Sequence, residues 1–474
     1  MVKYMRPQFY VLLAVLGGCT VGPNYRLPAQ ALINNHAAQA RFVSAGNATQ
    51  IAEPPDNWWH LFNDPTLDRL IRRALAANTD LRVAQANLER SNGLLAQARV
   101  AQQINATVDL DTSYEQLSAE SFLQGTQPPP MQLYNTGIAV SYDVDLFGGI
   151  RRGIEAATDD TEASQAARDL VRVNVAAETT RAYAEICNAG NELSAVRRSV
   201  ELQDQSLAFT RQLSSHGRAV SFDIDRAQGQ VEALQARIPL LQARQVNAAY
   251  RLNTLMGEPP ATFDRTWLGC HQPLRLKTLL PVGDGRSLLK RRPDVRAAER
   301  RLAAATARIG VATAALYPDI RLGASLGSTG AAADLFSPLT NRFGIGPMIS
   351  WNINQNDARA RIMMAKAQTR GSLASFDGTV LAALREVETS LNSYGAQLDR
   401  DASLTAARDH AAQVAATMED LHRGGRLNAL VALDAERKLA TADQAVAEAE
   451  SAISQSQISV FLALGGGWNT PAHP

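Results

Sequence analysis

The sequence predicts a mainly α-helical fold with a small β part, in which a unit of helix, strand, strand, long helix and helix occurs twice. One observation is a stretch of nearly seventy residues, about 149–215, that contains no helix stop. Another is a period of two in four short segments, which is typical of two-faced strands. The third is a turn signal that recurs at a constant separation of 208 residues (Gly217 with Gly425, Arg218 with Arg426). The chain is therefore interpreted as a tandem duplication.

Composition excludes some classes of function without suggesting one. Of the 474 residues, 46% are hydrophobic and 20% are charged, and the formal net charge is +1. Lysine and arginine are dispersed, so neither a basic face for nucleic acid nor a polybasic membrane patch is predicted. Aromatic residues make up only 6% of the chain while alanine is abundant, which favours long, closely packed helices and an extended architecture.

The N-terminus has the features of a bacterial export signal, assigned to residues 1–18. Lys3 and Arg6 precede an apolar run, 9–16, that is too short to span a bilayer as a stable anchor. The run ends in Leu-Gly-Gly-Cys, which resembles the lipobox of bacterial lipoproteins, where the cysteine receives the lipid and becomes the first residue. Cys19 is therefore the predicted lipidation site, although a stray cysteine in a signal peptide would look the same.

The residue after the cysteine indicates the membrane. An aspartate there favours retention in the inner membrane, and this chain has Thr20 instead, so we expect the outer membrane. Acyl chains on the cysteine would hold the protein at the bilayer without a transmembrane helix. Residues 19–57, with little periodicity, are predicted to form a lipidated N-terminal arm.

The first repeat is assigned to residues 58–257 and begins with two helices, expected at 58 to about 76 and at 78 to about 103. The hydrophobic period then changes to two at about 106–115 and again at about 136–147, with carboxylates on one face. This pattern fits strands of a membrane barrel with lipid outside and water inside. A soluble hairpin with one wet face would give the same alternation.

The long helix that follows is predicted to pack as a coiled coil, because apolar residues recur at seven along it (Ile186, Leu193, Val200, Leu207). It ends in a turn at about 217–221, where Ser221 is expected to cap the next helix and Asp223 to lie in its first turn. The descending helix is predicted to run without a break to Gly257. A Pro-, Gly- and Leu-rich linker, 258–286, follows.

The second repeat is assigned to residues 287–465. Its strands are expected at about 320–328 and 343–353 and its turn at about 424–429. Adding 208 to the apolar positions of the first descending helix gives apolar residues throughout (Leu439, Ala442, Val446, Ala449, Val460, Ala463), so the two halves share a core register. Residues 466–474 are predicted to be a polar tail.

Two motifs that could carry enzyme chemistry are better explained as structure. Ser325 lies in a G-x-S-x-G pattern, but an alternating strand surrounds it and no helix follows to make a nucleophile elbow. Ser287 opens an S-x-x-K pattern whose partner motifs are missing, and it is well placed as a helix N-cap. The seven histidines are scattered. We expect no enzyme, no cofactor and no metal site.

The remaining cysteines are too few for a disulfide framework. Cys187 is predicted to be a core residue, and Cys270, in the linker beside His271, is left unassigned.

Acidic residues near the two turns are the candidate functional residues. Asp223, Asp225 and Asp434 follow the turn glycines and could simply be capping or solvated acids. If several copies of the chain arranged these turns in a ring, however, the acids would line its axis and form a cation-attracting constriction. Gly217 and Gly425 are expected to be helix C-caps whose exposed turns serve as docking points.

Four motifs together resemble the TolC-like outer-membrane efflux ducts, in particular their NodT-type lipoprotein branch, over essentially the whole mature chain. They are the segments Cys19–Tyr25, Tyr142–Gly149, Arg291–Arg296 and Ala463–Trp468. The resemblance implies a homotrimer in which four strands per chain close a twelve-stranded barrel in the outer membrane while the helices form a periplasmic tunnel. An open sheet edge is not tolerated in lipid, so inserted strands would require such closure.

The resemblance also implies partners and site residues. A periplasmic membrane-fusion adaptor would contact the two turns (Gly217, Arg218, Gly425, Arg426), and an inner-membrane efflux pump would supply the energy. Aligned on the turn glycines, Asp223 and Asp434 are assigned to the acids that narrow the periplasmic entrance, and Asp225 is added for its proximity. The chain departs from the family pattern at Gln103–Ile104, at Asn354–Asp357 and at Val431, and the last of these positions lies near the second turn, among the expected gate residues.

The leading hypothesis is thus a passive exit duct for small toxic compounds, with no catalysis. A trimeric coiled-coil structural or adhesive lipoprotein without a lumen remains an alternative, and so does a protein-export duct of the same fold. The sequence contains no pocket that identifies the substrate.

Overall fold

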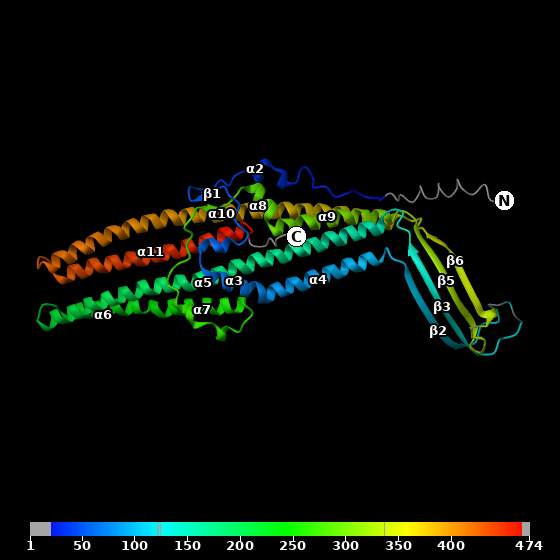
Figure 1. The fold of residues 1–474 in the computed structure, drawn as a ribbon, viewed down its shortest axis with the longest axis horizontal. Coiled ribbons are helices and arrows are strands. Elements are labelled where there is room, and N and C mark those ends of the chain that lie inside the picture. Colours follow the sequence, from blue (N-terminus) through cyan, green and yellow to red (C-terminus); the bar gives the residue numbers. More distant parts are fainter. Residues whose placement is uncertain (1–19, 121–122, 124, 336, 467–474) are drawn as a thin grey trace. The chain divides into compact units, whose positions relative to one another are not determined.

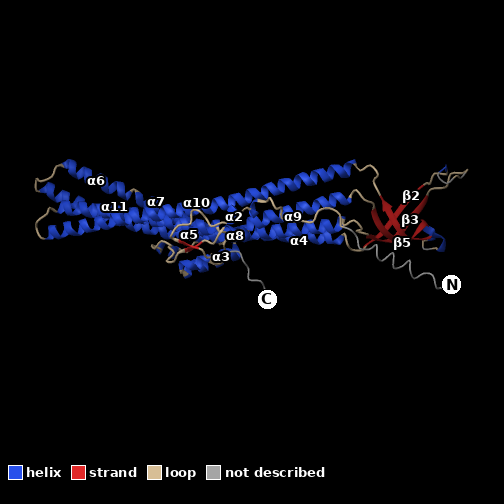
Figure 2. Cartoon of the chain, turned by 90° about the horizontal axis from the view of Figure 1, so that it is seen from above, coloured by secondary structure: helices blue, strands red, loops and turns tan. Residues whose placement is uncertain are grey.

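The computed structural model describes residues 20–120, 123, 125–335 and 337–466, and is mainly helical with one four-stranded sheet (Figures 1 and 2). The predicted signal peptide and Cys19 lie outside the described residues, as does nearly all of the predicted tail. Two compact units can be distinguished. One contains the described residues up to Pro28 with Leu88–Ser164 and Ala298–Phe376, and the other contains Ala29–Asn87, Gln165–Ala297 and the remainder from Asp377.

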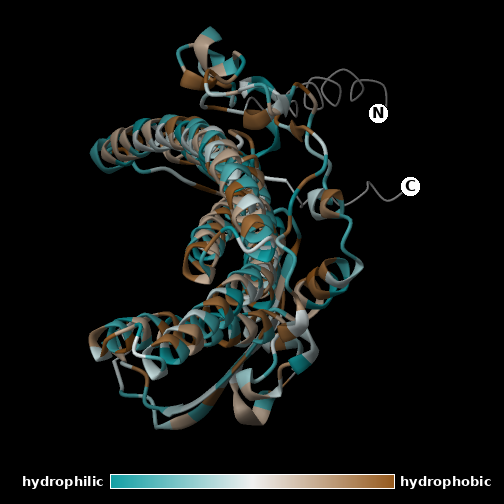
Figure 3. Ribbon diagram, turned by 90° about the vertical axis from the view of Figure 1, so that its left-hand side faces the viewer, coloured by the Kyte–Doolittle hydropathy of each residue, from teal (hydrophilic) through white to brown (hydrophobic). Residues whose placement is uncertain are grey.

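The duplicated order of elements is present. The first repeat has α4 (Thr79–Val100), β2 (Asn105–Glu115), β3 (Met131–Asp143), α5 (Gly149–Ser215), α6 (Ser221–Gln235) and α7 (Arg237–Leu255). The second has α9 (Pro293–Ala314), β5 (Asp319–Ala331), β6 (Asn341–Ser350), α10 (Asn356–Arg423) and α11 (Ala429–Ala463). The predicted mainly helical fold class is therefore confirmed. Figure 3 shows hydrophilic and hydrophobic residues interleaved along the long helices, as expected for helices with one packed face.

The sheet is antiparallel in the order β2-β3-β5-β6, and its register separates apolar from polar residues. Paired residues share a face, and one cross-strand row consists of Val108, Ile138, Leu326 and Phe343. The next row on that face is Ala106, Val140, Ala324 and Ile345. Most of these large side chains are exposed, including Val108 at 75% and Phe343 at 85%. The unit thus presents an apolar sheet face that its own residues leave uncovered.

Three strands differ in extent from the sequence prediction, and β3 differs most. It begins at Met131 rather than about 136 and ends at Asp143 rather than about 147. Residues 131–134 pair with Thr112–Glu115, so segment 131–134, predicted to be loop, extends the hairpin. The C-terminal end of β3 lies before the predicted residue 147 because the chain there turns into α5. The Asp145 carboxylate accepts hydrogen bonds from the N–H groups of Ile150 and Arg151 at the start of that helix.

The second-repeat strands also differ from the predicted bounds. β5 extends three residues beyond the predicted end, to Ala331, and β6 ends at Ser350 rather than 353. Beyond β6, the Trp351 indole donates to the carbonyl of Leu316 at 3.1 Å, which directs that segment to the end of α9 instead of along the sheet.

The descending helix of the first repeat is not continuous, so that prediction was wrong. It breaks at Ala236 between α6 and α7, and Pro239 lies three residues beyond the break. Proline has no N–H to donate, and its ring clashes with the carbonyl of the fourth preceding residue, here Gln235. The position 208 residues later is Ala447, within the unbroken α11, so the break is specific to the first repeat.

An aromatic cluster forms the core of the second unit. It involves η2 (Trp58–Phe62), α3 (Pro65–Ala77) and the end of α11. Trp58 is fully buried and stacks on Phe461 with ring centroids 4.6 Å apart, a contact worth about 0.5–1.5 kcal/mol beyond its buried area. The expected single helix over Trp58–Ala76 is divided because Asn63 has a left-handed backbone (φ 53°) and Asp64 caps α3.

Shorter elements attach the arm and the linker within this unit. The arm contributes η1 (Leu32–Asn34), α2 (His36–Gln39) and β1 (Thr49–Gln50), and β1 pairs in parallel with β4 (Leu280–Pro281) of the linker. The linker also forms η4 (Pro260–Thr262) and η5 (Arg265–Gly269). Short 3-10 turns η6 (Ala332–Asp334) and η7 (Pro338–Thr340) join β5 to β6 in the other unit.

Helix α8 (Gly285–Arg291) corrects the prediction that Ser287 is an N-cap. The cap is Asp284, whose carboxylate accepts the N–H of Ser287 at 2.8 Å, while the Ser287 hydroxyl contacts the N–H of Asp284 at 3.0 Å. This is a capping box in which Ser287 is the third helical residue.

Candidate functional site

The first helical turn, between α5 and α6, has the geometry of a glycine C-cap. Gly217 has φ +69°, and the N–H of Arg218 donates to the carbonyl of Leu213 at 2.9 Å. This bond spans five residues, as in a Schellman motif, and requires a left-handed residue, which glycine adopts without strain. Gly217 and Arg218 are both exposed.

The second turn, between α10 and α11, repeats this geometry. Gly425 has φ +70°, and the N–H of Arg426 donates to the carbonyl of Leu421 at 2.9 Å. Both residues are exposed. His422 differs from the first turn, because its imidazole lies 3.0 Å from the carbonyl of Leu427 and ties the turn together.

The turn acids have local partners. Asp223 is the third residue of α6, where its carboxylate accepts the N–H of Val220 at 3.4 Å and pairs with Arg226 at 3.3 Å. Val220 is therefore the N-cap position, and the expectation that Ser221 caps this helix was wrong. Asp225 is exposed.

Asp434 does not occupy the position equivalent to Asp223. It lies nine residues after Gly425, whereas Asp223 lies six after Gly217, so Asp434 corresponds to Arg226 and Asp223 to Val431. Asp434 pairs with Lys438 at 2.9 Å and is about half exposed. The alignment argument for these two acids therefore needs this correction, although each lies within the first two turns of its helix.

The segment Val21–Tyr25 docks on α5 and α9 through a buried arginine. Arg152 is only 3% exposed, and its guanidinium donates to the carbonyls of Val21 and Gly22 and to the Asn24 side chain at 2.6 Å. In addition, the N–H of Val21 donates to the carbonyl of Phe147 at 3.0 Å. These contacts fix the chain two residues after the predicted lipidation site.

Two glycines make this docking possible. Gly22 has φ +86°, and a Cβ there would lie 2.4 Å from the Cα of Gly310. A Cβ on Gly310 would in turn lie 2.7 Å from the Arg152 side chain. Only glycine at both positions allows the arm, α9 and the arginine to pack together.

An ionic cluster continues the docking site. The Arg300 guanidinium lies over the Tyr25 ring, 5.8 Å from its centroid, and pairs with Glu299, Glu162 and Asp159. Burial raises the pKa of Asp159 to about 6; Arg300 opposes this shift, and the charge of Glu162 adds to it. The sequence motif that follows the predicted lipidated cysteine is thus a structural latch.

The polar face of the sheet carries small and charged residues. Its rows include Thr107, Ala139, Ser325 and Gly344, and Asp143 opposite Arg321, which pair at 2.6 Å. Ser325 lies in the middle of β5 with Ala139 and Gly344 as its cross-strand neighbours, which provides no base for a nucleophile.

The two cysteines that follow Cys19 in the chain form a disulfide that the sequence argument missed. Cys187 on α5 and Cys270 of the linker are bonded, with Cα atoms 4.6 Å apart and a sequence separation of 83. Gly190 permits the approach, since a Cβ there would lie 2.1 Å from the carbonyl oxygen of Cys270. A signal was available in the sequence: once Cys19 is set aside for lipid, an exported chain with two remaining cysteines has one possible pairing.

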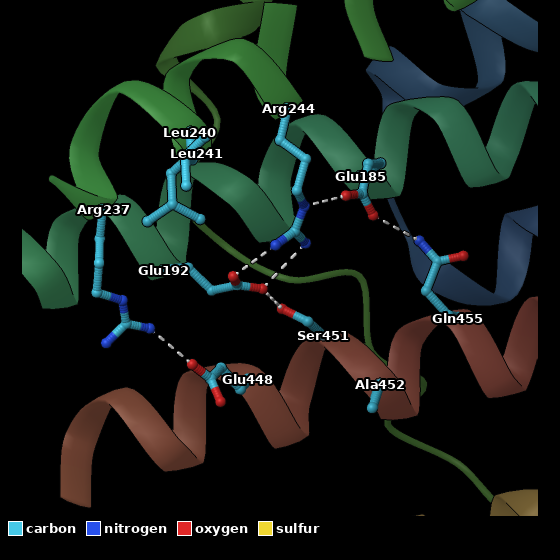
Figure 4. Close-up of a pocket in the computed structure, with 10 residues that line it drawn as sticks. All are labelled: Glu185, Glu192, Arg237, Leu240, Leu241, Arg244, Glu448, Ser451, Ala452 and Gln455. Carbon is cyan, nitrogen blue, oxygen red and sulfur yellow. Dashed lines mark hydrogen bonds and ion pairs between the residues drawn. The ribbon is translucent and has the colours of Figure 1, made fainter. Parts of the chain in front are cut away.

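A polar pocket of about 510 Å³ lies between α5, α7 and α11 (Figure 4). Arg244 projects into it between Glu185 and Glu192 and contacts Glu192 with two hydrogen bonds, of 2.7 and 3.1 Å. Burial alone would lower the pKa of Arg244, but these two carboxylates raise it above its ordinary value. Ser451 on α11 donates to Glu192 at 2.8 Å. The pocket is thus a cross-helix network with its charges paired.

Neither a membrane-spanning helix nor a metal-binding cluster is found in the described part of the chain. None of its helices is long and apolar enough to cross a bilayer. It contains no group of three or more His, Cys, Asp or Glu residues that could hold a metal ion.

Comparison with known proteins decides the family. The family model described as "Outer membrane efflux protein" matches residues 70–258 and 285–466, which include both repeats. The chain belongs to the outer membrane efflux protein family. The resemblance inferred from the sequence motifs is therefore confirmed, and the protein is an outer-membrane efflux protein.

Named relatives of this efflux protein agree with that assignment. It is 29% identical over 471 residues to the solvent efflux pump outer membrane protein SrpC of Pseudomonas putida, covering 98% of each chain. It is 28% identical to the pyoverdine export outer membrane protein OpmQ of Pseudomonas aeruginosa, covering 91% of each. A probable outer membrane lipoprotein of Salmonella typhimurium, SilC, is 27% identical over 96% of this chain and 97% of SilC.

Solved structures show the same fold. The outer-membrane channel OprN aligns with a TM-score of 0.86 and 33% identity, over 95% of this efflux protein and all of OprN. The Neisseria gonorrhoeae MtrE channel, solved in an open state, aligns with a TM-score of 0.80 and 26% identity over 95% of this chain and 99% of MtrE.

Proposed function

We propose that this efflux protein is a passive exit duct, formed by three copies of the chain, through which small toxic compounds leave the cell. The observation that carries the proposal is the sheet, which has an exposed apolar face, a polar face and β2 and β6 as its outer strands. Unpaired edges are not stable in lipid, so insertion requires neighbouring copies to pair them. Three copies of four strands would make a twelve-stranded barrel.

The proposed partners are a periplasmic adaptor and an inner-membrane pump. The relatives SrpC and OpmQ are named as components of a solvent efflux pump and of pyoverdine export. We assign adaptor contact to the exposed turn residues Gly217, Arg218, Gly425 and Arg426. Energy would come from the pump, and adaptor binding would favour an open arrangement of the turns. The duct itself would catalyse no reaction.

Asp223 and Asp434 are the proposed gate acids, with Asp225 as a neighbouring candidate. Three copies of each turn around an axis would bring their carboxylates together. A ring of negative charges in a narrow entrance attracts cations. The local pairing with Arg226 and Lys438 reduces this charge without removing it, because both acids remain at least one-third exposed.

Cys19 is the proposed lipid attachment point. It precedes Val21 by two residues in the chain. The N–H of Val21 donates a hydrogen bond to the carbonyl of Phe147, which follows β3 closely. The acyl chains would therefore enter the bilayer beside the base of the barrel. The latch would therefore set the height of the lipid relative to the strands.

The first experiment is to determine the mass and shape of the detergent-extracted mature protein and its conductance in a planar bilayer. We expect a trimer with a low conductance that rises when Asp223 and Asp434 are both replaced by alanine. Asp443→Ala, farther along α11, is the matched control and should leave conductance unchanged. A monomer, or a trimer that does not conduct even without the gate acids, would favour the coiled-coil scaffold and contradict the duct.

A further inference from the structure

The polar face of the sheet carries an arginine, Arg342. Register places Arg342 of β6 in one cross-strand row with Gly327, Gly137 and Asp109. These positions lie opposite in phase to the apolar row of Val108 and Phe343, so Arg342 belongs to the polar face. In the proposed duct, that face lines the lumen.

The Arg342 side chain lies directly over the two glycines of this row. A Cβ on Gly137 would lie 3.3 Å from Nη2 of Arg342, and a Cβ on Gly327 would lie 3.3 Å from its Cζ. The guanidinium therefore extends from β6 across β5 toward β3, close to the backbone. Larger residues at these two positions would lift it off the sheet.

Two neutral acceptors hold the guanidinium in place. Nε donates to the Thr329 hydroxyl at 2.9 Å, and Nη2 donates to the Asn135 side-chain oxygen at 2.7 Å. Thr329 and Asn135 are also bonded to each other at 2.8 Å, so the acceptors are themselves fixed. Arginine has five N–H donors, and these contacts use two of them. The other three remain for a ligand.

The charge of Arg342 is not neutralised locally. Arg321, the other arginine on this face, pairs with Asp143 at 2.6 Å, whereas Arg342 forms no ion pair within the described residues. An amide and a hydroxyl oxygen hold this positive charge without the ion pair that offsets Arg321. Asp109 and Asp111 lie on the same face of β2, so acidic residues follow the β2 edge of the sheet and Arg342 supplies the positive charge on β6.

We propose that Arg342 is an anion-recognition point in the lumen of the barrel, for halide ions and for the carboxylate, sulfonate or phosphate groups of exported solutes. A guanidinium is weakly hydrated and binds oxyanions through paired donors, which suits transient contact with a passing solute. The inference rests on the proposed duct, because three copies of Arg342 face one lumen only if the strands close into a barrel.

The test is the reversal potential of the purified trimer in planar bilayers under a KCl gradient. It is done in the background with both gate acids replaced, so that the barrel contributes measurably. Arg342→Gln should raise the permeability ratio of K⁺ to Cl⁻ about two-fold near 10 mM salt, where the Debye length is about 30 Å. The difference should disappear at 1 M, where that length is about 3 Å.

Two further variants separate charge from structure. Arg342→Lys keeps the charge and should keep the wild-type selectivity, whereas a structural role would make it resemble the glutamine variant. Arg361→Gln, on exposed α10 outside the strands, is the matched control and should not change the ratio.

The outcomes distinguish the two proposals. Normal conductance with the same reversal potential for wild type and Arg342→Gln would overturn the anion site and leave the duct intact. Absence of conductance in every variant would overturn the duct, and the anion site with it.

Discussion

Breaking the disulfide between Cys187 and Cys270 should destabilise the protein substantially, and the expected size follows from its position in the chain. The bond closes a loop of 83 residues. In the chain-entropy treatment, a loop of that length restricts the unfolded chain by about 4.5 kcal/mol at 25 °C. Measured losses are usually smaller, so removing the bond should lower the free energy of unfolding by about 2–4 kcal/mol.

The variant to use is the double replacement Cys187→Ala and Cys270→Ala. Alanine avoids burying a hydroxyl at Cys187, which is fully buried. The assay is denaturant unfolding of the detergent-extracted protein, followed by intrinsic tryptophan fluorescence, to which Trp267 on η5, three residues before Cys270, contributes. Reductant should shift the wild type toward the double variant and should leave the double variant unchanged.

A second substitution checks the same contact without touching sulfur. Gly190→Ala would place a Cβ 2.1 Å from the Cys270 carbonyl and should also destabilise, since the backbone there has to move. Free thiols in the purified wild type would contradict the pairing itself. Oxidised wild type and double variant that unfold within about 0.5 kcal/mol of each other would refute the loop-entropy reasoning.

Three other predictions concern named side chains. Arg152→Ala should release the Val21–Tyr25 latch, so that limited proteolysis cuts the arm, whereas Arg151→Ala should leave the arm protected; equal cleavage would contradict the latch. Because the folded pKa of Asp159 is about 6, above its ordinary 3.8, ionisation opposes folding. The free energy of unfolding should therefore rise as pH falls from about 7 to about 5, by at most about 1 kcal/mol after allowing for solvent screening. Asp159→Asn should lack this rise, and a variant that keeps it would contradict the pKa assignment. In thermal unfolding, Arg244→Ala should cost at least about 2 kcal/mol and Gln444→Ala about 1 kcal/mol, and equal losses would contradict the charge argument.

Much of the fold could be predicted because its signals are local and repeated. The long helix α5 has no stop between Gly149 and Ser215, and the glycine turns recur at 208 residues. The period of two predicted that the four strands exist, but it did not predict where each strand begins and ends. The limits of β3 depend on which carboxylate caps α5 and on pairing with β2, and neither is visible in one segment of sequence.

The break between α6 and α7 shows a different limit. Pro239 was visible in the sequence, but a strong apolar register on both sides favoured continuity. In the structure the apolar register continues across the break, and the helix is interrupted at Ala236. Pro239 cannot donate a backbone hydrogen bond to Gln235, so an unbroken helix would lose that bond there.

The candidate site was predicted less completely than the fold, since its chemistry depends on contacts between distant segments. The motif Val21–Tyr25 was recognised as a family signature, but its function as a latch required Arg152 and Gly310, which lie more than a hundred residues away. Asp223 and Asp434 were assigned by alignment on the turn glycines, and their unequal spacing from those glycines shows that the duplication does not extend to the acids.

The divergence of the repeats also indicates which hairpin separates at lower cost. Within the first repeat, Arg244 of α7 is held by two glutamates of α5, and separating them would leave charges of which Glu192 is only 10% exposed. Helix α11 contributes neutral side chains to this network: Ser451 donates to Glu192, and Gln444 donates to the Ser199 hydroxyl. Each of these bonds is weaker than an ion pair between two buried charges, because one partner carries no charge that separation would leave unpaired. The ion pair between Glu448 of α11 and Arg237 of α7 is more than two-fifths exposed on both sides and adds little. An opening that moves α11 away from α5 and α7 therefore leaves the ion pairs of the first hairpin intact.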